Sequence, residues 1–122
     1  MSTVLVVEDS LTDSEVITRC LRQMGLTIIS VTTGEEALTQ LQSQKPDLVI
    51  LDVMLPGQSG FEICHSLKTN DETKQIPVVI YSSKGTDVDK LWGTMLGASA
   101  YLAKPVDPQQ LIPVVQQLLV SR

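Results

Sequence analysis

The stretch Leu48-Val49-Ile50-Leu51-Asp52 decides the fold of this 122-residue chain, because it joins four aliphatic residues in a row to a carboxylate. An apolar run of this length predicts a strand that is buried on both faces of a sheet. Open α/β folds bind their ligands at the edge where the strands end. We therefore take Asp52 as the centre of a candidate site.

Short apolar runs alternate with longer amphipathic stretches five times along the chain. The predicted strands are 4–7, 27–31, 48–51, 78–81 and 100–102, and the predicted helices cover about 11–24, 34–44, 61–67, 88–96 and the stretch from 108 onward. This alternation indicates right-handed crossovers and one doubly wound parallel sheet with helices on both faces, the α/β class. The polar segment 68–75 is predicted to be a loop. Pro113 is expected to kink the last helix or to separate its first turn, because proline lacks a backbone N–H.

Composition and length favour one domain over residues 1–122, since 43% of the residues are hydrophobic and no linker or repeat interrupts them. The formal net charge is −5 and there is no basic run, which argues against a nucleic-acid partner. No stretch approaches the roughly 18 apolar residues of a membrane span. The first residues lack the basic region of a signal peptide, so a cytoplasmic protein without membrane insertion is expected. Cys20 and Cys64 show no metal-binding spacing and are predicted to be reduced, partly buried thiols.

Polar side chains follow three more of the predicted strands. Glu8-Asp9 follows the first, Ser82 the fourth and Lys104 the fifth. Each is an ordinary residue for a turn, and only their joint occurrence favours a site. Crowded carboxylates repel one another unless a cation lies between them, and oxygen ligands without His or Cys suit Mg²⁺ or Mn²⁺. Lys104 could pair with Asp52 in the empty site and with a phosphoryl oxygen in the filled one.

With these segments in order, the chain resembles the receiver domain of two-component response regulators, in the CheY-like single-domain form, over essentially its whole length. The matching segments are 4–10, 47–60, 77–83 and 97–105. The resemblance implies a flavodoxin/CheY-like sheet of five parallel strands in the order 2-1-3-4-5. It also implies a magnesium-dependent switch in which Asp52 takes a phosphoryl group from a histidine kinase or a phosphotransfer protein.

The resemblance further implies a role for each matching position. The implied catalytic residues are Asp52, Ser82 and Lys104. The implied Mg²⁺ ligands are Glu8, Asp9, Asp52 and the backbone carbonyl of Met54. Ser82 and Tyr101 would form the switch, with Tyr101 turning inward as Ser82 moves.

The expected output is a changed surface formed by the fourth helix, fifth strand and fifth helix. Because no second domain is recognised, this surface is expected to serve a protein effector. Trp92 is either a contact there or a semi-buried core residue, and Leu91-Trp92-Gly93 is similar to family members of motility or chemotaxis-like pathways. The side chains of Met54 and Lys84 are expected to tune hydrolysis of the acyl phosphate. No enzymatic activity is expected beyond the chain's own phosphorylation and dephosphorylation.

Other functions remain open. The chain could be a phosphate sink for a histidine kinase, or a pseudo-receiver that binds partners without phosphorylation, although a pseudo-receiver would be expected to lack part of the acid–lysine set. A phosphatase with an Asp nucleophile is disfavoured because position 54 holds Met rather than a second acid. A flavin-binding protein of the same architecture is disfavoured because Glu8-Asp9 would repel a phosphate.

Overall fold

The computed structural model describes residues 2–83 and 85–120, and within them strands and helices alternate strictly along the chain. The strands are β1 (Thr3–Val7), β2 (Thr27–Val31), β3 (Leu48–Asp52), β4 (Val78–Ser82) and β5 (Ala100–Ala103). The helices are α1 (Leu11–Gln23), α2 (Gly34–Ser43), α3 (Gly60–Thr69), α4 (Asp87–Met95) and α5 (Pro108–Val120). The predicted alternation is confirmed.

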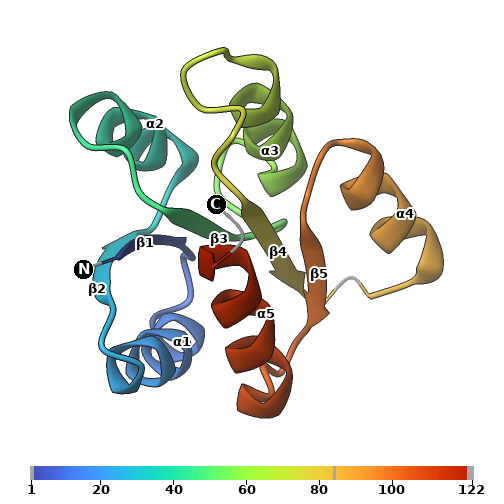
Figure 1. The fold of residues 1–122 in the computed structure, drawn as a ribbon. Coiled ribbons are helices and arrows are strands. Elements are labelled where there is room, and N and C mark those ends of the chain that lie inside the picture. Colours follow the sequence, from blue (N-terminus) through green and yellow to red (C-terminus); the bar gives the residue numbers. More distant parts are fainter. Residues whose placement is uncertain (1, 84, 121–122) are drawn as a thin grey trace.

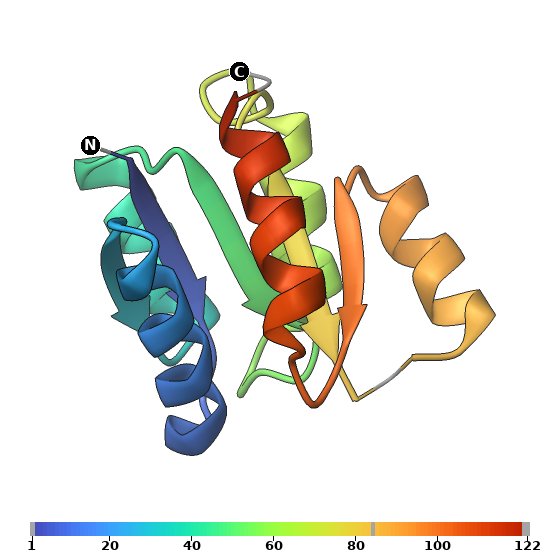
Figure 2. The same cartoon turned by 60° about the horizontal axis from the view of Figure 1, so that its bottom comes forward.

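The five strands form one parallel sheet in the order β2-β1-β3-β4-β5. Figure 2 shows that the strands point the same way, so their carboxyl ends meet along one edge. The predicted class and strand order are both confirmed. In β1, β3 and β4 nearly every residue is buried, which explains why these strands lack polar alternation.

Helices cover both faces of the sheet, with α1 and α5 on one face and α2, α3 and α4 on the other (Figure 1). Side chains alternate along each strand and so feed two separate cores. In β1, Leu5 and Val7 pack in the core under α2 and α3, whereas Val4 and Val6 pack in the core under α1 and α5.

Some predicted boundaries shift in the structure. Asp52 and Ser82 are the last residues of β3 and β4 rather than the first residues after them. The polar loop begins later than predicted, because α3 continues through Thr69. Of the two effects expected of Pro113, separation of the first turn of α5 does not occur, since one helix runs from Pro108 to Val120. Pro113 is exposed, so water can satisfy the carbonyl that lacks its N–H partner.

Cys20 and Cys64 are free thiols, as expected, and both are buried. The Lys104–Pro105 peptide bond is cis. Within residues 2–83 and 85–120, no helix has both the length and the apolar character needed to cross a membrane.

Gly60 begins α3 directly against the end of β3. Its N–H donates to the carbonyl oxygen of Val53 at 2.9 Å, and a Cβ atom here would overlap the backbone carbonyl of Asp52 and approach Leu51 Cδ1 to 2.7 Å. The start of α3 can therefore approach the site strand this closely only because residue 60 has no side chain.

We expect Gly60→Ala to lower the free energy of unfolding by more than about 2 kcal/mol, because backbone rather than a flexible side chain must move. Urea denaturation measures this. Gly85→Ala is the matched control: an added Cβ there meets only Ala103 Cβ at 3.7 Å, an ordinary contact, and should change stability by less than about 0.5 kcal/mol. Equal stability of the two variants would contradict the tight packing of α3 on β3.

Candidate functional site

The register of the sheet brings the predicted site residues together. Val7 pairs with Leu51, so Glu8 follows β1 beside Asp52. Asp52 itself pairs with Tyr81 on β4. One position further, Ser82 pairs with Ala103, and Lys104 follows directly. Four strands thus deliver their terminal side chains to one place, as the apolar runs predicted.

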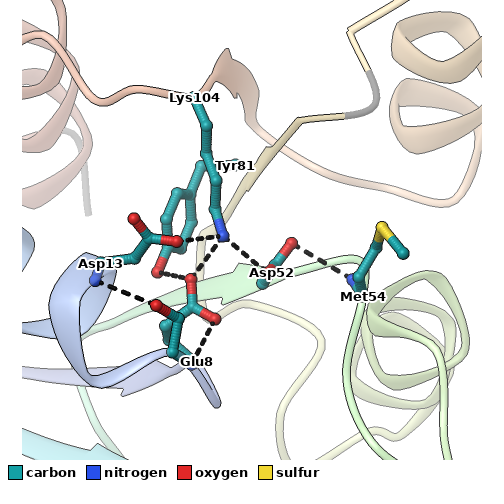
Figure 3. Close-up of polar contacts among 7 residues, drawn as sticks. Glu8, Asp13, Asp52, Met54, Tyr81 and Lys104 are labelled. Atoms are coloured by element: carbon teal, nitrogen blue, oxygen red, sulfur yellow. Dashed lines mark hydrogen bonds and ion pairs between the residues drawn. The ribbon is translucent and has the colours of Figure 1, made fainter.

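The ammonium group of Lys104 occupies the middle of this cluster (Figure 3). Its Nζ lies 2.6 Å from Glu8 Oε1, 2.8 Å from Asp52 Oδ2 and 2.9 Å from Asp13 Oδ2. The Lys104 side chain is mostly buried, and these three contacts raise its pKa even though burial acts to lower it. Lys104 therefore stays charged and offsets part of the negative charge around it.

Glu8 is a fully buried carboxylate that is held by three donors. Besides Lys104, the hydroxyl of Tyr81 donates to Oε1 at 2.7 Å, and the backbone N–H of Ser10 donates to Oε2 at 3.1 Å. Burial acts to raise the pKa of Glu8, but hydrogen bonds from Lys104, Tyr81 and Ser10 outweigh it and hold the pKa below its ordinary value. Glu8 is thus ionised and fixed in orientation.

Asp52 has fewer donors for a similar degree of burial. Lys104 donates to Oδ2, and the backbone N–H of Met54 donates to Oδ1 at 3.2 Å. Burial raises the pKa of Asp52, and the nearby charge of Glu8 adds to this, so that hydrogen bonds from Lys104 and Met54 do not bring it back to its ordinary value. The ionised form of Asp52 is therefore costly in the resting protein, and a further cation beside it would be favourable.

Three carboxylates at this edge can converge on a metal ion. Glu8, Asp9 and Asp52 each offer an oxygen, and these atoms all lie within 4.8 Å of one another. Glu8 and Asp52 are buried, whereas Asp9 is exposed and gives the group an open side. An all-carboxylate donor set of this kind fits Mg²⁺ or Mn²⁺. The backbone of Met54 reaches the same place through its N–H, while its side chain is exposed.

Ser82 ends β4, and Tyr101 lies on the neighbouring strand β5. Ser82 is fully buried, and Tyr101 is half-buried in the core under α2, α3 and α4. Burial and the charge of Asp89 raise the pKa of Tyr101, while a hydrogen bond with the Ser82 side chain acts in the opposite direction. A Cβ on Gly93 of α4 would come within 2.9 Å of Tyr101 Cδ2, so the ring rests against the backbone of that helix. Ser82 and Tyr101 are therefore physically linked.

Sequence reasoning missed two residues of the cluster, Asp13 and Tyr81. Asp13 is in the first turn of α1, which starts from the loop after β1 and so lies over the same edge. Tyr81 could have been found from the sequence, because it places a hydroxyl group in an otherwise aliphatic buried strand. A buried tyrosine hydroxyl normally has a hydrogen-bond partner, which points to a polar group nearby. Trp92 is 49% exposed on α4, which favours the surface alternative for this residue. Lys84 lies outside the described residues.

Asp52→Asn is expected to raise the free energy of unfolding at pH 7 in Mg²⁺-free buffer, because the buried carboxylate is ionised at a cost that the neutral amide avoids. The folded pKa of Asp52 lies above its ordinary value of 3.8, so the ionised carboxylate opposes folding above that folded pKa, and this effect disappears below pH 3.8. Added Mg²⁺ should stabilise the wild type more than the variant.

Urea denaturation at pH 7 and at pH 3 checks this prediction. Asp71→Asn serves as control because it removes one charge from a side chain that is 92% exposed, and it should change stability by less than about 0.5 kcal/mol. If Asp52→Asn is less stable than the wild type in Mg²⁺-free buffer at pH 7, the ionised carboxylate of Asp52 does not oppose folding, and the prediction is contradicted.

A similar arrangement of sequence and fold occurs in known proteins. The chain is 34% identical over 121 residues to protein PilH of Pseudomonas aeruginosa, covering 99% of this chain and all of PilH. A putative response regulator from Chloroflexus aurantiacus J-10-fl superposes with a TM-score of 0.93 at 36% identity over 98% of both chains.

Two further structures are similar. The chemotaxis response regulator CheY4 of Vibrio cholerae has a TM-score of 0.89 at 28% identity, over 97% of this chain and 98% of CheY4. The Mn²⁺-bound form of response regulator Rcp1 has a TM-score of 0.82 at 29% identity, over 97% of this chain and 91% of Rcp1. The family model described as "response regulator receiver domain" matches residues 4–116, nearly the whole chain, and the protein belongs to this family.

Proposed function

We propose that the chain is a switch in which Asp52 accepts a phosphoryl group from a phosphohistidine donor in a Mg²⁺-dependent reaction. The single observation that carries this proposal is the pairing of a buried, electrostatically stressed Asp52 with the ammonium group of Lys104 at 2.8 Å. A nucleophile for phosphoryl transfer needs cations beside it, because the incoming group is itself an anion. The donor would be a histidine kinase or a phosphotransfer protein.

Glu8, Asp9, Asp52 and the backbone carbonyl of Met54 would hold the metal ion. The convergence of three carboxylates on one open-sided place supports this assignment, as does the Mn²⁺-bound form of the similar regulator Rcp1. Mg²⁺ would supply positive charge that offsets both the attacking carboxylate and the incoming phosphoryl group.

In the proposed reaction, a carboxylate oxygen of Asp52 attacks the phosphorus atom in line with the bond to histidine. The new P–O bond gives an acyl phosphate, and the electron pair of the broken P–N bond returns to the imidazole ring. Lys104 would bind one phosphoryl oxygen, and the hydroxyl of Ser82 would donate to another. Water later hydrolyses the acyl phosphate, so the only chemistry is the chain's own phosphorylation and dephosphorylation.

The switch would run from Ser82 to Tyr101 and on to the surface of α4, β5 and α5. Movement of Ser82 towards the phosphoryl group would break its present link with Tyr101 and let the ring turn inward. The surface of α4 suits a protein effector because it carries exposed apolar side chains: Val88, Leu91, Trp92 and Met95. The similarity to a chemotaxis response regulator supports a cytoplasmic motility or chemotaxis-like pathway.

Intact-protein mass spectrometry after incubation with acetyl phosphate tests the proposal. We expect the wild type to gain one phosphoryl group with Mg²⁺ and none without it, because charge at the site must be offset before an anion can approach. Asp52→Asn should gain none in either case, and Asp71→Asn, which leaves the site intact, should behave as the wild type.

A folded wild type that gains no phosphoryl group would next be given a phosphohistidine donor. Failure with both donors would contradict the proposal and favour a pseudo-receiver.

A further inference from the structure

Asp13 contacts Lys104 but has no part in the proposed phosphoryl transfer. Its carboxylate Oδ2 accepts from Lys104 Nζ at 2.9 Å, an ion pair between α1 and the end of β5 (Figure 3). Its backbone N–H donates to Ser10 Oγ, the N-cap of α1, at 3.3 Å. The backbone of Asp13 is therefore fixed, and its carboxylate points at Lys104.

The donors of Lys104 are all in use in this resting state. An ammonium group has three N–H donors, and Glu8, Asp13 and Asp52 accept at 2.6, 2.9 and 2.8 Å. While Asp52 is still an unmodified carboxylate, an arriving phosphoryl oxygen can therefore be bound by Lys104 only after one of these three carboxylates has lost its hydrogen bond.

The exposed fractions of the three side chains indicate which carboxylate loses its hydrogen bond to Lys104. The side chains of Glu8 and Asp52 are 0% and 4% exposed, so neither can replace the lost donor with water. The Asp13 side chain is 41% exposed and can be rehydrated. Releasing Asp13 therefore costs the least, because a buried charge without a partner is far less favourable than a solvated one. The arriving phosphoryl group also repels the Asp13 carboxylate, which acts in the same direction.

We propose that Asp13 is a positioning residue that restrains the Lys104 ammonium group in the resting state and gives up its hydrogen bond to the arriving phosphoryl oxygen. This inference rests on the proposed function. Asp13 stabilises the unphosphorylated form and slows phosphorylation, since each transfer must first replace the ion pair that Asp13 makes with Lys104.

Phosphorylation rates of Asp13→Asn test this role. The rate is followed by intact mass with acetyl phosphate, at a Mg²⁺ concentration that saturates each protein according to its separately measured Kd for Mg²⁺. Asp13→Asn should react faster than the wild type by about threefold or more, because Lys104 is released and one repulsive charge is removed.

Glu15→Gln is the matched control. Glu15 is on the same helix, pairs with Arg19 at 3.2 Å and has a side chain that is 65% exposed, so the variant removes one charge without touching Lys104. Salt screens such exposed charges, and the rate should stay within about twofold of the wild type. An Asp13→Asn rate equal to or below that of Glu15→Gln would overturn the proposal.

A second measurement needs no phosphoryl donor. A double-mutant cycle of Asp13→Asn and Lys104→Met, followed by urea denaturation, should give a favourable coupling between the two residues in the resting protein. A coupling energy of zero would overturn the proposal that Asp13 restrains Lys104, even if the phosphorylation rates of Asp13→Asn and the wild type differ. If the folded wild type accepts a phosphoryl group from no donor, the proposed function is overturned instead. The proposed exchange of the Asp13 hydrogen bond for a phosphoryl oxygen then falls with it.

Discussion

The ammonium group of Lys104 lies among the carboxylates of Glu8, Asp13 and Asp52, and the arrangement of the whole carboxyl edge depends on it. Two of these carboxylates are almost fully buried, where an unpaired charge is very unfavourable. Such a pair contributes little net stability, because the attraction is offset by the cost of removing both charges from water. Its main effect is on geometry: it fixes the carboxylate oxygens and keeps their negative charge concentrated at one place.

The two faces of the sheet connect this cluster to different parts of the molecule. Tyr81 belongs to the core under α1 and α5, and its hydroxyl supports Glu8. Its ring also lies 5.0 Å from Lys104 Nζ, so the tyrosine contacts both members of the ion pair. Tyr101 belongs to the opposite core and contacts Ser82 and α4 instead. One face thus holds the charges in place, and the other connects the site with an exposed apolar surface.

Much of this could be predicted from the sequence, because it depends on local pattern. The apolar runs located the strands, and a parallel sheet necessarily collects their terminal residues, which brought Glu8, Asp52, Ser82 and Lys104 together. The strand order came from family resemblance rather than from periodicity. Asp13 was missed because its contact depends on how the first turn of α1 is oriented over the edge, which no spacing in the sequence specifies. Separation of the first turn, one of the two effects expected of Pro113, does not occur, because the exposed side of α5 tolerates a missing hydrogen bond.

The dependence of the edge on Lys104 is tested most directly by the stability of Lys104→Met. In Mg²⁺-free buffer at pH 7 we expect this variant to lose about 3 kcal/mol or more of unfolding free energy in urea denaturation, because Glu8 and Asp52 remain buried without their cation. The loss should shrink on acidification, which neutralises these carboxylates, and on addition of Mg²⁺, which replaces the missing charge. A variant as stable as the wild type, or a loss that responds to neither pH nor Mg²⁺, would contradict the account.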